Sequence, residues 1–451
     1  MNKAESDTPE KKEPSFGKLL DALNKKIHWK TAKQGGALNV YRPVQGRFFE
    51  LLTPSDCKME VRRHMKKLPP GLIASLSTAL QEDEARLFDL NLFVETRKKG
   101  IGFKNGFFDI TTGKLREYHS NDFVLDPLPL DIPERRDPEV EEYFEKVIKQ
   151  WVGENVGGWF INLLAYLLFI FPNKEQIWVN FFGQGSNGKS VCLRILEEIL
   201  GYEKIIGCDL SNLNRFSNAT FEGKWLVVGR DSSELVSEGA TSFIKNYSGD
   251  ERSLVERKGG ASYDVVTAGK LIVSTNKLIK SKDRTFSWFR RIIPVSFPNE
   301  FARDPDFEED LIKKVPAICR FLLHRAYCYR SNKIPVAKYL PGEVQTLINE
   351  TRWTNDRVSA FCELYFKRET EEHTFEADTQ KIYDLHLKSM TQVYDLYCQW
   401  HCDQFGELAI EPSIHSFGGK YGAFMTSDIG KKFELKRLAC GKVLELKEGR
   451  A

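Results

Sequence analysis

The feature that most constrains the fold of this chain is a glycine-rich loop between a short apolar strand and a helix. The stretch "FFGQGSNGKSVCLRILEEILG" contains the pattern Gly183-x-x-x-x-Gly188-Lys189-Ser190. Glycines allow backbone N–H groups to approach a phosphate closely, and the positive N-terminal end of the following helix favours the same anion. The stretch therefore predicts a site for a nucleoside triphosphate in an α/β domain.

The residues of this loop have distinct expected roles. Lys189 would reach the β- and γ-phosphates of the nucleotide, and the hydroxyl of Ser190 would hold Mg²⁺. Further contacts with the nucleotide are expected from the rest of the loop, which comprises Gly183, Gln184, Gly185, Ser186, Asn187, Gly188 and Val191. A nucleoside triphosphate and Mg²⁺ are therefore the expected cofactors.

Two later apolar runs end in polar side chains that suit phosphate chemistry. "KWLVVGRDSSE" (224–234) contains a buried-strand run followed by Asp231, the candidate catalytic acid and second Mg²⁺ ligand, with Glu234 as a further candidate acid. The alternative is a strand followed by a solvated acidic turn. "KLIVSTN" (270–276) ends in Asn276, whose amide would orient the attacking water or contact the γ-phosphate; taken alone, it is typical of a turn.

Two arginines stand immediately before the next apolar run, "IIPVSF". Arg290 and Arg291 are candidate arginine fingers, which stabilise charge on the γ-phosphate in a neighbouring subunit. This role requires an oligomeric ring. The alternative is a surface pair in salt bridges.

A predicted hairpin lies between the acid and the asparagine. Ser253–Arg257 and Tyr263–Thr267 are expected to pair, which places Lys258 at a glycine-supported tip. Arg257 and Lys258 are the candidate DNA contacts, since a projecting lysine suits a phosphate backbone in a narrow channel. A solvated tip is the alternative.

In this order, the motifs resemble those of superfamily 3 helicases, in the group found in phages, plasmids and poxviruses. "GQGSNGKS" is similar to that group's Gly-x-Gly-x-Asn-Gly-Lys-Ser form, "FEGKWLVVGRD" to its second motif, "LIVSTN" to its sensor strand and "WFRRIIPVSF" to its arginine segment. "FIKNYSGDERSLVERKGG" matches a further segment at Lys245, Gly249, Asp250, Arg257 and Lys258. Two departures are that Asp231 stands where glutamate is usual, and that no histidine and proline follow Asn276.

This resemblance implies an AAA+-like ATPase that forms a hexameric ring and unwinds DNA, moving 3′ to 5′, during replication of a mobile genetic element. ATP would be hydrolysed between subunits, with Arg290 or Arg291 supplied in trans, and the Lys258 hairpins would grip single-stranded DNA in the pore. The expected partners are single-stranded and forked DNA, other copies of the chain, and a separate primase or initiator. Two rivals stay open: an ATP-regulated DNA-binding initiator or loader without processive unwinding, and a small-molecule kinase, against which the motif order argues.

The predicted fold class is α/β, with an AAA+-like P-loop ATPase core, an N-terminal α+β accessory module and a C-terminal, mostly helical winged-helix domain. A hairpin is expected over 102–115, and the proline-rich stretch 126–138 is typical of a linker. The expected divisions are a disordered tail (1–14), the accessory module (15–136), the ATPase domain with its leading helices (137–305), a helical connection (306–345) and the winged-helix-like DNA-binding domain (346–451).

Composition and apolar patterning point to a cytoplasmic protein without a membrane segment. The most apolar run, Trp159–Phe171, is too short to cross a bilayer and predicts a buried helix. The nine cysteines are scattered, which favours a reducing compartment. The net charge of +3 is too small to indicate a nucleic-acid partner by itself.

Two further features have competing interpretations. Cys398, His401 and Cys402 could share one face of the helix predicted over 391–406 and hold zinc, but that helix is also expected to bury Val393, Leu396, Tyr397 and Trp400, which favours a core role. The basic residues of the predicted hairpin at 420–447 suit a DNA-binding wing and a lysine-guarded sheet edge equally well.

Overall fold

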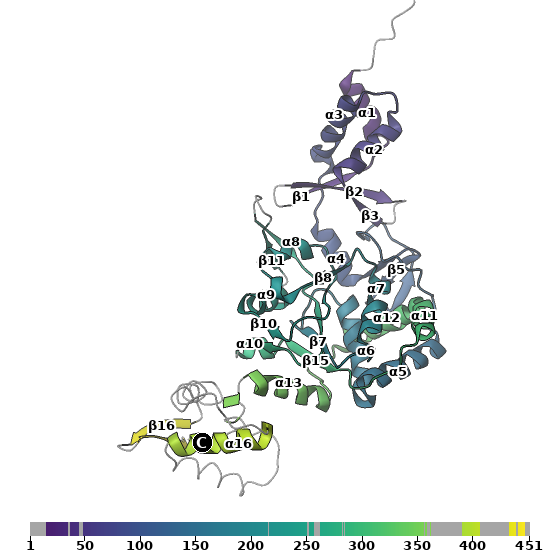
Figure 1. Cartoon of the computed structure of the whole chain (residues 1–451). Helices are drawn as coiled ribbons and strands as arrows, with labels where there is room; N and C mark the ends of the chain where they lie inside the picture. Colours follow the sequence, from purple (N-terminus) through teal and green to yellow (C-terminus); the bar gives the residue numbers. More distant parts are fainter. Residues whose placement is uncertain are drawn as a thin grey trace, which may run out of the picture.

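The centre of the computed structural model is a five-stranded, all-parallel sheet with the strand order β15-β7-β13-β9-β8. Figure 1 labels β7, β8 and β15 of this sheet. Its strands are β7 (Trp178–Phe182), β8 (Ile205–Cys208), β9 (Leu226–Gly229), β13 (Leu271–Thr275) and β15 (Ile292–Ser296). The structure describes residues 15–34, 37–44, 48–214, 216–249, 252–256, 262–281, 283, 285–355, 357–358, 361, 390–405, 433–438 and 441–446. The predicted α/β core is confirmed at this level.

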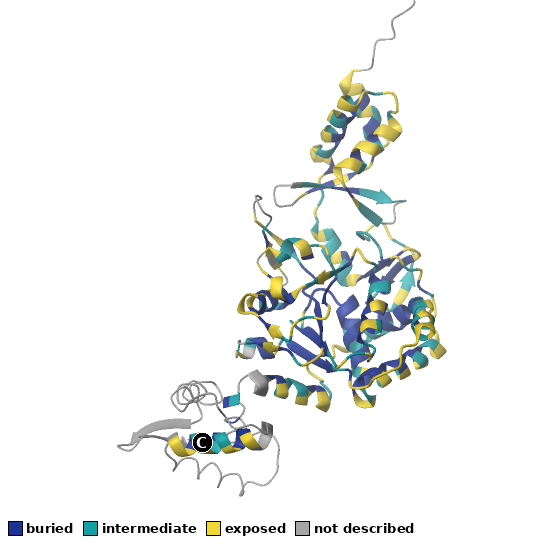
Figure 2. Cartoon of the chain, viewed as in Figure 1, coloured by how far each residue is buried: buried dark blue, intermediate teal, exposed yellow. Residues whose placement is uncertain are grey.

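Alternate residues of the strands enter two separate cores, one on each face of the sheet. Val179 and Ile272 pack in one core, whereas Trp178 and Leu271 pack in the other. Because both faces are covered, the strands are almost continuous apolar runs rather than alternating ones. Figure 2 shows this burial concentrated in the sheet and the helices beside it.

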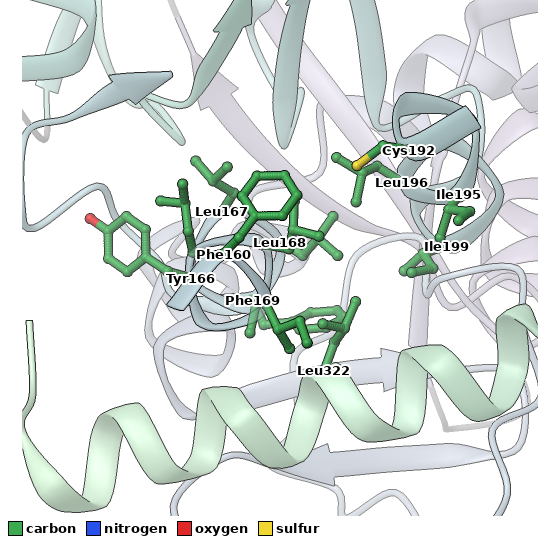
Figure 3. Close-up of a cluster of buried hydrophobic side chains, with 14 of the residues drawn as sticks. Phe160, Tyr166, Leu167, Leu168, Phe169, Cys192, Ile195, Leu196, Ile199 and Leu322 are labelled. Atoms are coloured by element: carbon green, nitrogen blue, oxygen red, sulfur yellow. The ribbon is translucent and has the colours of Figure 1, made fainter. Parts of the chain in front are cut away.

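One face is covered by α5 (Pro138–Val152), α6 (Glu154–Phe169), α7 (Lys189–Leu200), α11 (Pro305–Lys313) and α12 (Val315–Asn332). Phe144, Val147, Ile148 and Trp151 form a buried apolar stripe on α5, and α6 is buried on nearly every side, as its composition predicts. Figure 3 shows side chains of α6 and α7 in this core, with Leu322 of α12 close to Phe169. Within the described ranges, no single helix is long and apolar enough to span a membrane. Helices α5 and α6 reach that length and apolar character only together, and the chain bends by 114° between them.

The other face is covered by α8 (Ser217–Phe221), α9 (Glu238–Gly249) and α10 (Phe286–Phe289), with the short pair β10 (Leu235–Val236) and β14 (Lys280–Ser281) nearby. Stacked and edge-on aromatic pairs fill this core; Phe243 and Tyr247 stack with ring centroids 5.8 Å apart. The hairpin β11 (Arg252–Val255) and β12 (Tyr263–Val266) leaves the α/β core between α9 and β13. Its pairing confirms the hairpin predicted for this stretch.

The described elements between Phe16 and Arg86 form a smaller unit with a core of its own. It consists of α1 (Phe16–Asn24), β1 (Lys30–Gln34), β2 (Ala37–Val44), β3 (Phe48–Leu52), α2 (Pro54–His64), α3 (Pro70–Gln81) and the 3₁₀ turn η1 (Glu84–Arg86). The three strands form an antiparallel sheet in sequence order. Phe49 of β3 donates its backbone N–H to the carbonyl of Val124 (2.7 Å), which ties this unit to the following segment.

The next segment, α4 (Asn91–Lys99), β4 (Gly100–Phe103), β5 (Gly106–Asp109) and β6 (Lys114–Arg116), contains the predicted hairpin, which is confirmed. Ile101 and Phe108 belong to the same core as α5 and α6. The proline-rich stretch 126–138 is not a free linker: Leu128 and Ile132 are buried in that core, and the backbone of Ile132 is bonded in both directions to the Asn105 amide (2.8 and 3.2 Å).

The C-terminal elements are α13 (Gly342–Asn355), α16 (Met390–Phe405) and the antiparallel hairpin β16 (Phe433–Leu438)–β17 (Gly441–Leu446). The helix and the hairpin confirm the elements predicted there. Tyr397, Trp400 and His401 of α16 are buried while Cys402 is exposed, which agrees with the core interpretation of this helix. Among the described residues, no group of three or more His, Cys, Asp or Glu side chains is placed to hold a metal ion.

Candidate nucleotide site

The phosphate loop joins β7 to α7 at the carboxyl end of β7, as the sequence predicts. Gly185 and Gly188 have φ angles of 119° and 89°, in the region that favours glycine. A Cβ at Gly188 would lie 2.6 Å from the indole of Trp151, which is buried at the end of α5. The loop therefore needs glycine at this position both for its backbone turn and for the close approach of α5.

Lys189 points into the loop rather than into solvent. Its side chain is largely buried, and its Nζ donates hydrogen bonds to the Gly183 carbonyl (2.6 Å) and to Asn187 Oδ1 (2.9 Å). Asn187 in turn donates from Nδ2 to the carbonyl of Phe297 (3.1 Å), so its orientation is set from outside the loop. Burial lowers the pKa of Lys189, and the negative charge of Asp231 opposes this shift. A partly desolvated cation inside a loop of backbone N–H groups suits a phosphate anion.

Asp231 lies beside this lysine because the end of β13 holds two segments at once. The Ser274 carbonyl accepts from the backbone of Ser232 (3.0 Å), and the Thr275 carbonyl accepts from the backbone of Gly183 (3.3 Å). Asp231 itself is exposed, in a left-handed conformation with φ 44°. Glu234 uses its backbone carbonyl to accept from Lys280 (2.7 Å), and within the described residues no hydrogen bond or ion pair joins its carboxylate to the loop.

Asn276 follows β13 directly and lines a cavity of about 420 Å³ together with Gly183, Gln184 and Asn187. Ser190 is exposed in the first turn of α7, and Ser186 is exposed at the top of the loop. The carboxyl edge of the sheet thus brings together the loop, Asp231 and Asn276. A cavity of this size is within the range used by small-molecule sites.

Arg290 and Arg291 lie at the amino ends of the strands, opposite the end of the sheet that carries the phosphate loop. They precede β15, which runs parallel to β7, so the length of a five-residue strand, roughly 16 Å, separates them from the loop of the same chain. Arg290 donates to Gln176 Oε1 (2.7 Å) and Arg291 to the carbonyl of Ser287 (2.5 Å).

The hairpin β11–β12 is anchored to the α8 region at both strands. Asn218 donates to the Leu254 carbonyl (2.9 Å), and the Tyr263 hydroxyl donates to Glu222 Oε2 (2.7 Å). The candidate DNA contacts Arg257 and Lys258 lie outside the described residues, as does Asp250. Lys245, which matches the same family segment, forms an ion pair with Asp283 (2.9 Å).

Sequence reasoning missed a buried amide under the site. Asn180 is fully buried in β7, and its Nδ2 donates to the Val273 carbonyl (3.1 Å) and to Thr275 Oγ1 (2.8 Å). It therefore links the strand before the loop to the strand before Asn276. The signal was present: one polar residue interrupts the apolar run "WVNFF".

Comparison with known proteins gives distant relatives that bear on this site. Residues 181–291 match the model of DUF5906, described as a family of unknown function, and this range includes every motif from the loop to the arginines. "Putative helicase 121R" of Invertebrate iridescent virus 3 is 26% identical over 258 residues, which is 53% of this chain and 26% of that protein. "Putative helicase 184R" of Invertebrate iridescent virus 6 is 24% identical over 271 residues, or 55% and 27% of the two chains. The chain thus spans about a quarter of the length of these curated relatives.

Solved structures are similar over nearly the whole chain. The A-form apo structure of the NrS-1 C-terminal region has a TM-score of 0.50 at 13% identity, covering 97% of this chain and 100% of that one. A second apo structure of the region, residues 305–718, gives 0.50 at 11% identity, with 96% and 99% covered. At such low identity this similarity concerns the fold alone. The viral relatives support a helicase-like protein.

Proposed function

We propose that this chain is an ATP-dependent DNA helicase that serves replication of a mobile genetic element and acts as a ring of identical subunits. The observation that carries the proposal is the carboxyl edge of the parallel sheet, where the phosphate loop, Asp231 and Asn276 meet. Distant relatives named as helicases support the same activity. The motif order supports superfamily 3 and an AAA+-like mechanism.

The residues of the loop fit ATP with Mg²⁺. Lys189 is desolvated and lies among backbone N–H groups, and its hydrogen-bond acceptors in the described part of the chain are neutral oxygens, so a phosphate would supply a counter-charge. Ser190 presents an exposed hydroxyl at the helix N-terminus for the metal, and Asp231 is the nearby carboxylate. Mg²⁺ would neutralise charge on the phosphate oxygens. Asp231 would then orient and deprotonate the attacking water, and Asn276 would contact the γ-phosphate.

The position of the two arginines supports a site completed by another subunit. Arg290 and Arg291 are too far along the sheet to reach the loop of their own chain. In a ring, they would act on the loop of a neighbouring subunit instead. A guanidinium supplied in trans would stabilise charge that develops on the γ-phosphate. The hairpin carrying Arg257 and Lys258 would contact single-stranded DNA in the centre of the ring.

Forked-duplex unwinding and DNA-stimulated ATPase activity, measured side by side, test the proposal. The wild-type chain should separate the strands with ATP and Mg²⁺, and Lys189→Ala should abolish both activities while leaving the chain folded. Hydrolysis of ATP without strand separation would overturn the helicase proposal and favour an ATP-regulated initiator or loader. Phosphorylation of a small molecule, with no response to DNA, would favour a kinase.

Mixing subunits tests the arginines. Lys189→Ala chains retain their arginines, and Arg290→Ala or Arg291→Ala chains retain their loops, so a mixed ring should regain ATPase activity that neither variant has alone. A mixture that stays inactive, or a chain that stays monomeric with nucleotide and DNA, would reject completion in trans.

A further inference from the structure

A second cavity, of about 680 Å³, lies at the amino edge of the sheet, away from the phosphate loop. Lys204 and Trp225 line it and directly precede β8 and β9, whose carboxyl ends point toward the nucleotide site. Arg97 of α4, Tyr41 of β2 and strand β12 complete its walls. The cavity therefore collects residues from the N-terminal unit, the ATPase core and the hairpin.

Arg97 is placed as an unneutralised cation on this wall. Its guanidinium carbon lies 4.1 Å from the ring centre of Phe171 and 4.0 Å from that of Trp225. Its Nε is buried without a hydrogen-bond partner, and within the described ranges no carboxylate forms an ion pair with it. Burial lowers the pKa of Arg97 to about 9, which reflects the missing counter-charge. Two aromatic faces compensate only part of this desolvation.

A second buried cation stands beside it. Lys204 is 9% exposed, and its nearest carboxylate oxygen, Asp126 Oδ2, is 3.7 Å from Nζ. Burial lowers the pKa of Lys204; Asp126 opposes that shift, and the positive charge of Arg97 adds to it. The cavity lining carries four cations and two acids: Lys33, Arg97, Lys204, Arg252, Glu222 and Asp264. Of the acids, Glu222 already accepts a hydrogen bond from Tyr263 (2.7 Å).

Aromatic side chains lie next to these cations. Tyr41 and Phe93 line the cavity with ring centroids 5.2 Å apart and ring planes tilted by 54°, and Trp225 and Tyr263 also contribute to the lining. Stacked aromatic faces bind unpaired bases of any sequence, while paired cations bind the phosphate. The volume also suits a nucleotide-sized ligand.

We propose that this cavity binds a nucleotide unit, with its phosphate beside Arg97 and Lys204 and its base against the aromatic wall. The ligand chemistry rests on the cavity alone. Its assignment to single-stranded DNA rather than a free nucleotide rests on the proposed helicase function, because β12 of the proposed DNA-contacting hairpin forms one wall.

Fluorescence anisotropy of a labelled oligo(dT) 20-mer tests the site. Arg97→Ala should weaken binding about tenfold or more, since hydrogen bonds to a charged group are worth roughly 1.5–3 kcal/mol, and should make the affinity less dependent on salt. The matched control is Lys98→Ala, which removes the same charge from the neighbouring position of α4, where Lys98 pairs with Glu95 (2.9 Å) outside the cavity. Its affinity should stay within about twofold of wild type, the range expected for an exposed ion pair.

Three arms separate this proposal from the proposed function. The Arg97→Ala variant should keep its ATPase activity in the absence of DNA, and the Lys189→Ala variant should lose it. Lys189→Ala should still bind oligo(dT), and this binding should still depend on Arg97. Equilibrium dialysis of dTMP against Lys189→Ala chains, with and without Arg97→Ala, measures the free nucleotide. Dependence on Arg97 for dTMP but not for oligo(dT) would assign the cavity to a free nucleotide. If Arg97→Ala weakens the binding of neither dTMP nor oligo(dT), the proposal is overturned.

Photo-crosslinking of the unaltered chain covers the case in which Arg97→Ala does not fold. A 5-bromodeoxyuridine oligonucleotide, and 5-bromodeoxyuridine monophosphate separately, should crosslink to peptides that contain Phe93, Trp225 or Tyr263. Crosslinks confined to other peptides with both probes would overturn the site.

Discussion

Replacement of Gly188 by alanine tests whether the phosphate loop owes its shape to contact with α5. The alanine backbone would have to keep φ 89°, and its Cβ would lie 2.6 Å from the Trp151 indole. Trp151 is 2% exposed and has little room to move. The left-handed backbone costs about 1–2 kcal/mol, and overpacking of a buried side chain costs about 1–3 kcal/mol more. We expect Gly188→Ala to lower the free energy of unfolding by roughly 2–5 kcal/mol.

Two matched glycines separate the two contributions. Gly185 has φ 119°, and no atom lies within 4 Å of the point that a Cβ would occupy, so Gly185→Ala should show the backbone cost alone, about 1–2 kcal/mol. Gly158 lies exposed within α6, again with open space, and is not in a left-handed conformation. Gly158→Ala should stabilise the chain by about 0.5–1 kcal/mol, because alanine is the better helix former.

Urea denaturation followed by circular dichroism would rank the three variants by midpoint, with binding of a fluorescent ATP analogue measured in parallel. The expected order of stability is Gly158→Ala, wild type, Gly185→Ala, Gly188→Ala. Equal midpoints for the two loop variants would show that the Trp151 contact costs nothing. If Gly188→Ala were as stable as Gly158→Ala, the whole explanation of the loop would be refuted.

Three further predictions follow from single contacts. Asp231→Asn should reduce kcat for ATP hydrolysis by about 100-fold or more, while Glu234→Gln should stay within a few-fold of wild type. The reason is that the negative charge of Asp231, and not that of Glu234, acts on Lys189. Steady-state ATPase assays test this, and a larger loss in Glu234→Gln would contradict it. Burial would raise the pKa of Asp122, but hydrogen bonds from Arg116 (2.6 and 2.9 Å) and a backbone amide outweigh it and hold that pKa below its usual range. The carboxylate's stabilisation is therefore complete above the usual pKa and is lost as pH falls through the lowered one, so Asp122→Asn should cost about 1–2 kcal/mol at pH 7 and progressively less as the pH falls below the usual pKa, as measured by urea midpoints across pH. Asn218→Ala should speed amide hydrogen exchange in β11 by about fivefold or more, since it removes the bond to the Leu254 carbonyl; unchanged exchange would show that this anchor is not needed.

Local features of the fold followed from the sequence because local patterns carry them. The helices expected to lead the domain from residue 137 begin with α5, and the hairpin expected over 102–115 is β4–β5. The strand ending before Asp231 and the one ending before Asn276 were recognisable because buried parallel strands are continuous apolar runs.

Contacts between distant segments could not be predicted in the same way. Nothing in the residues around Gly188 shows that Trp151, 37 positions earlier, occupies the space of its missing side chain. The segment 126–138 has the composition of a linker, yet Leu128 and Ile132 provide enough apolar surface for it to pack in the core. Arg97 carries no motif at all, and only the fold brings Phe171 and Trp225 to its two faces.

The central strand β13 joins the two edges of the sheet that the proposed function uses. The hairpin strand β12 enters it at one end, and Asn276 leaves it at the other. β13 is hydrogen-bonded to β7 on one side and to β9 on the other, and the buried Lys270 at its start donates to the Tyr166 and Ile170 carbonyls at the end of α6. A strand held in this way cannot slide alone, because a shift would break bonds on both sides and leave a buried lysine without acceptors. Movement of the hairpin with the nucleotide state is therefore expected as rotation of the whole sheet and its helices, not as a displacement transmitted along β13.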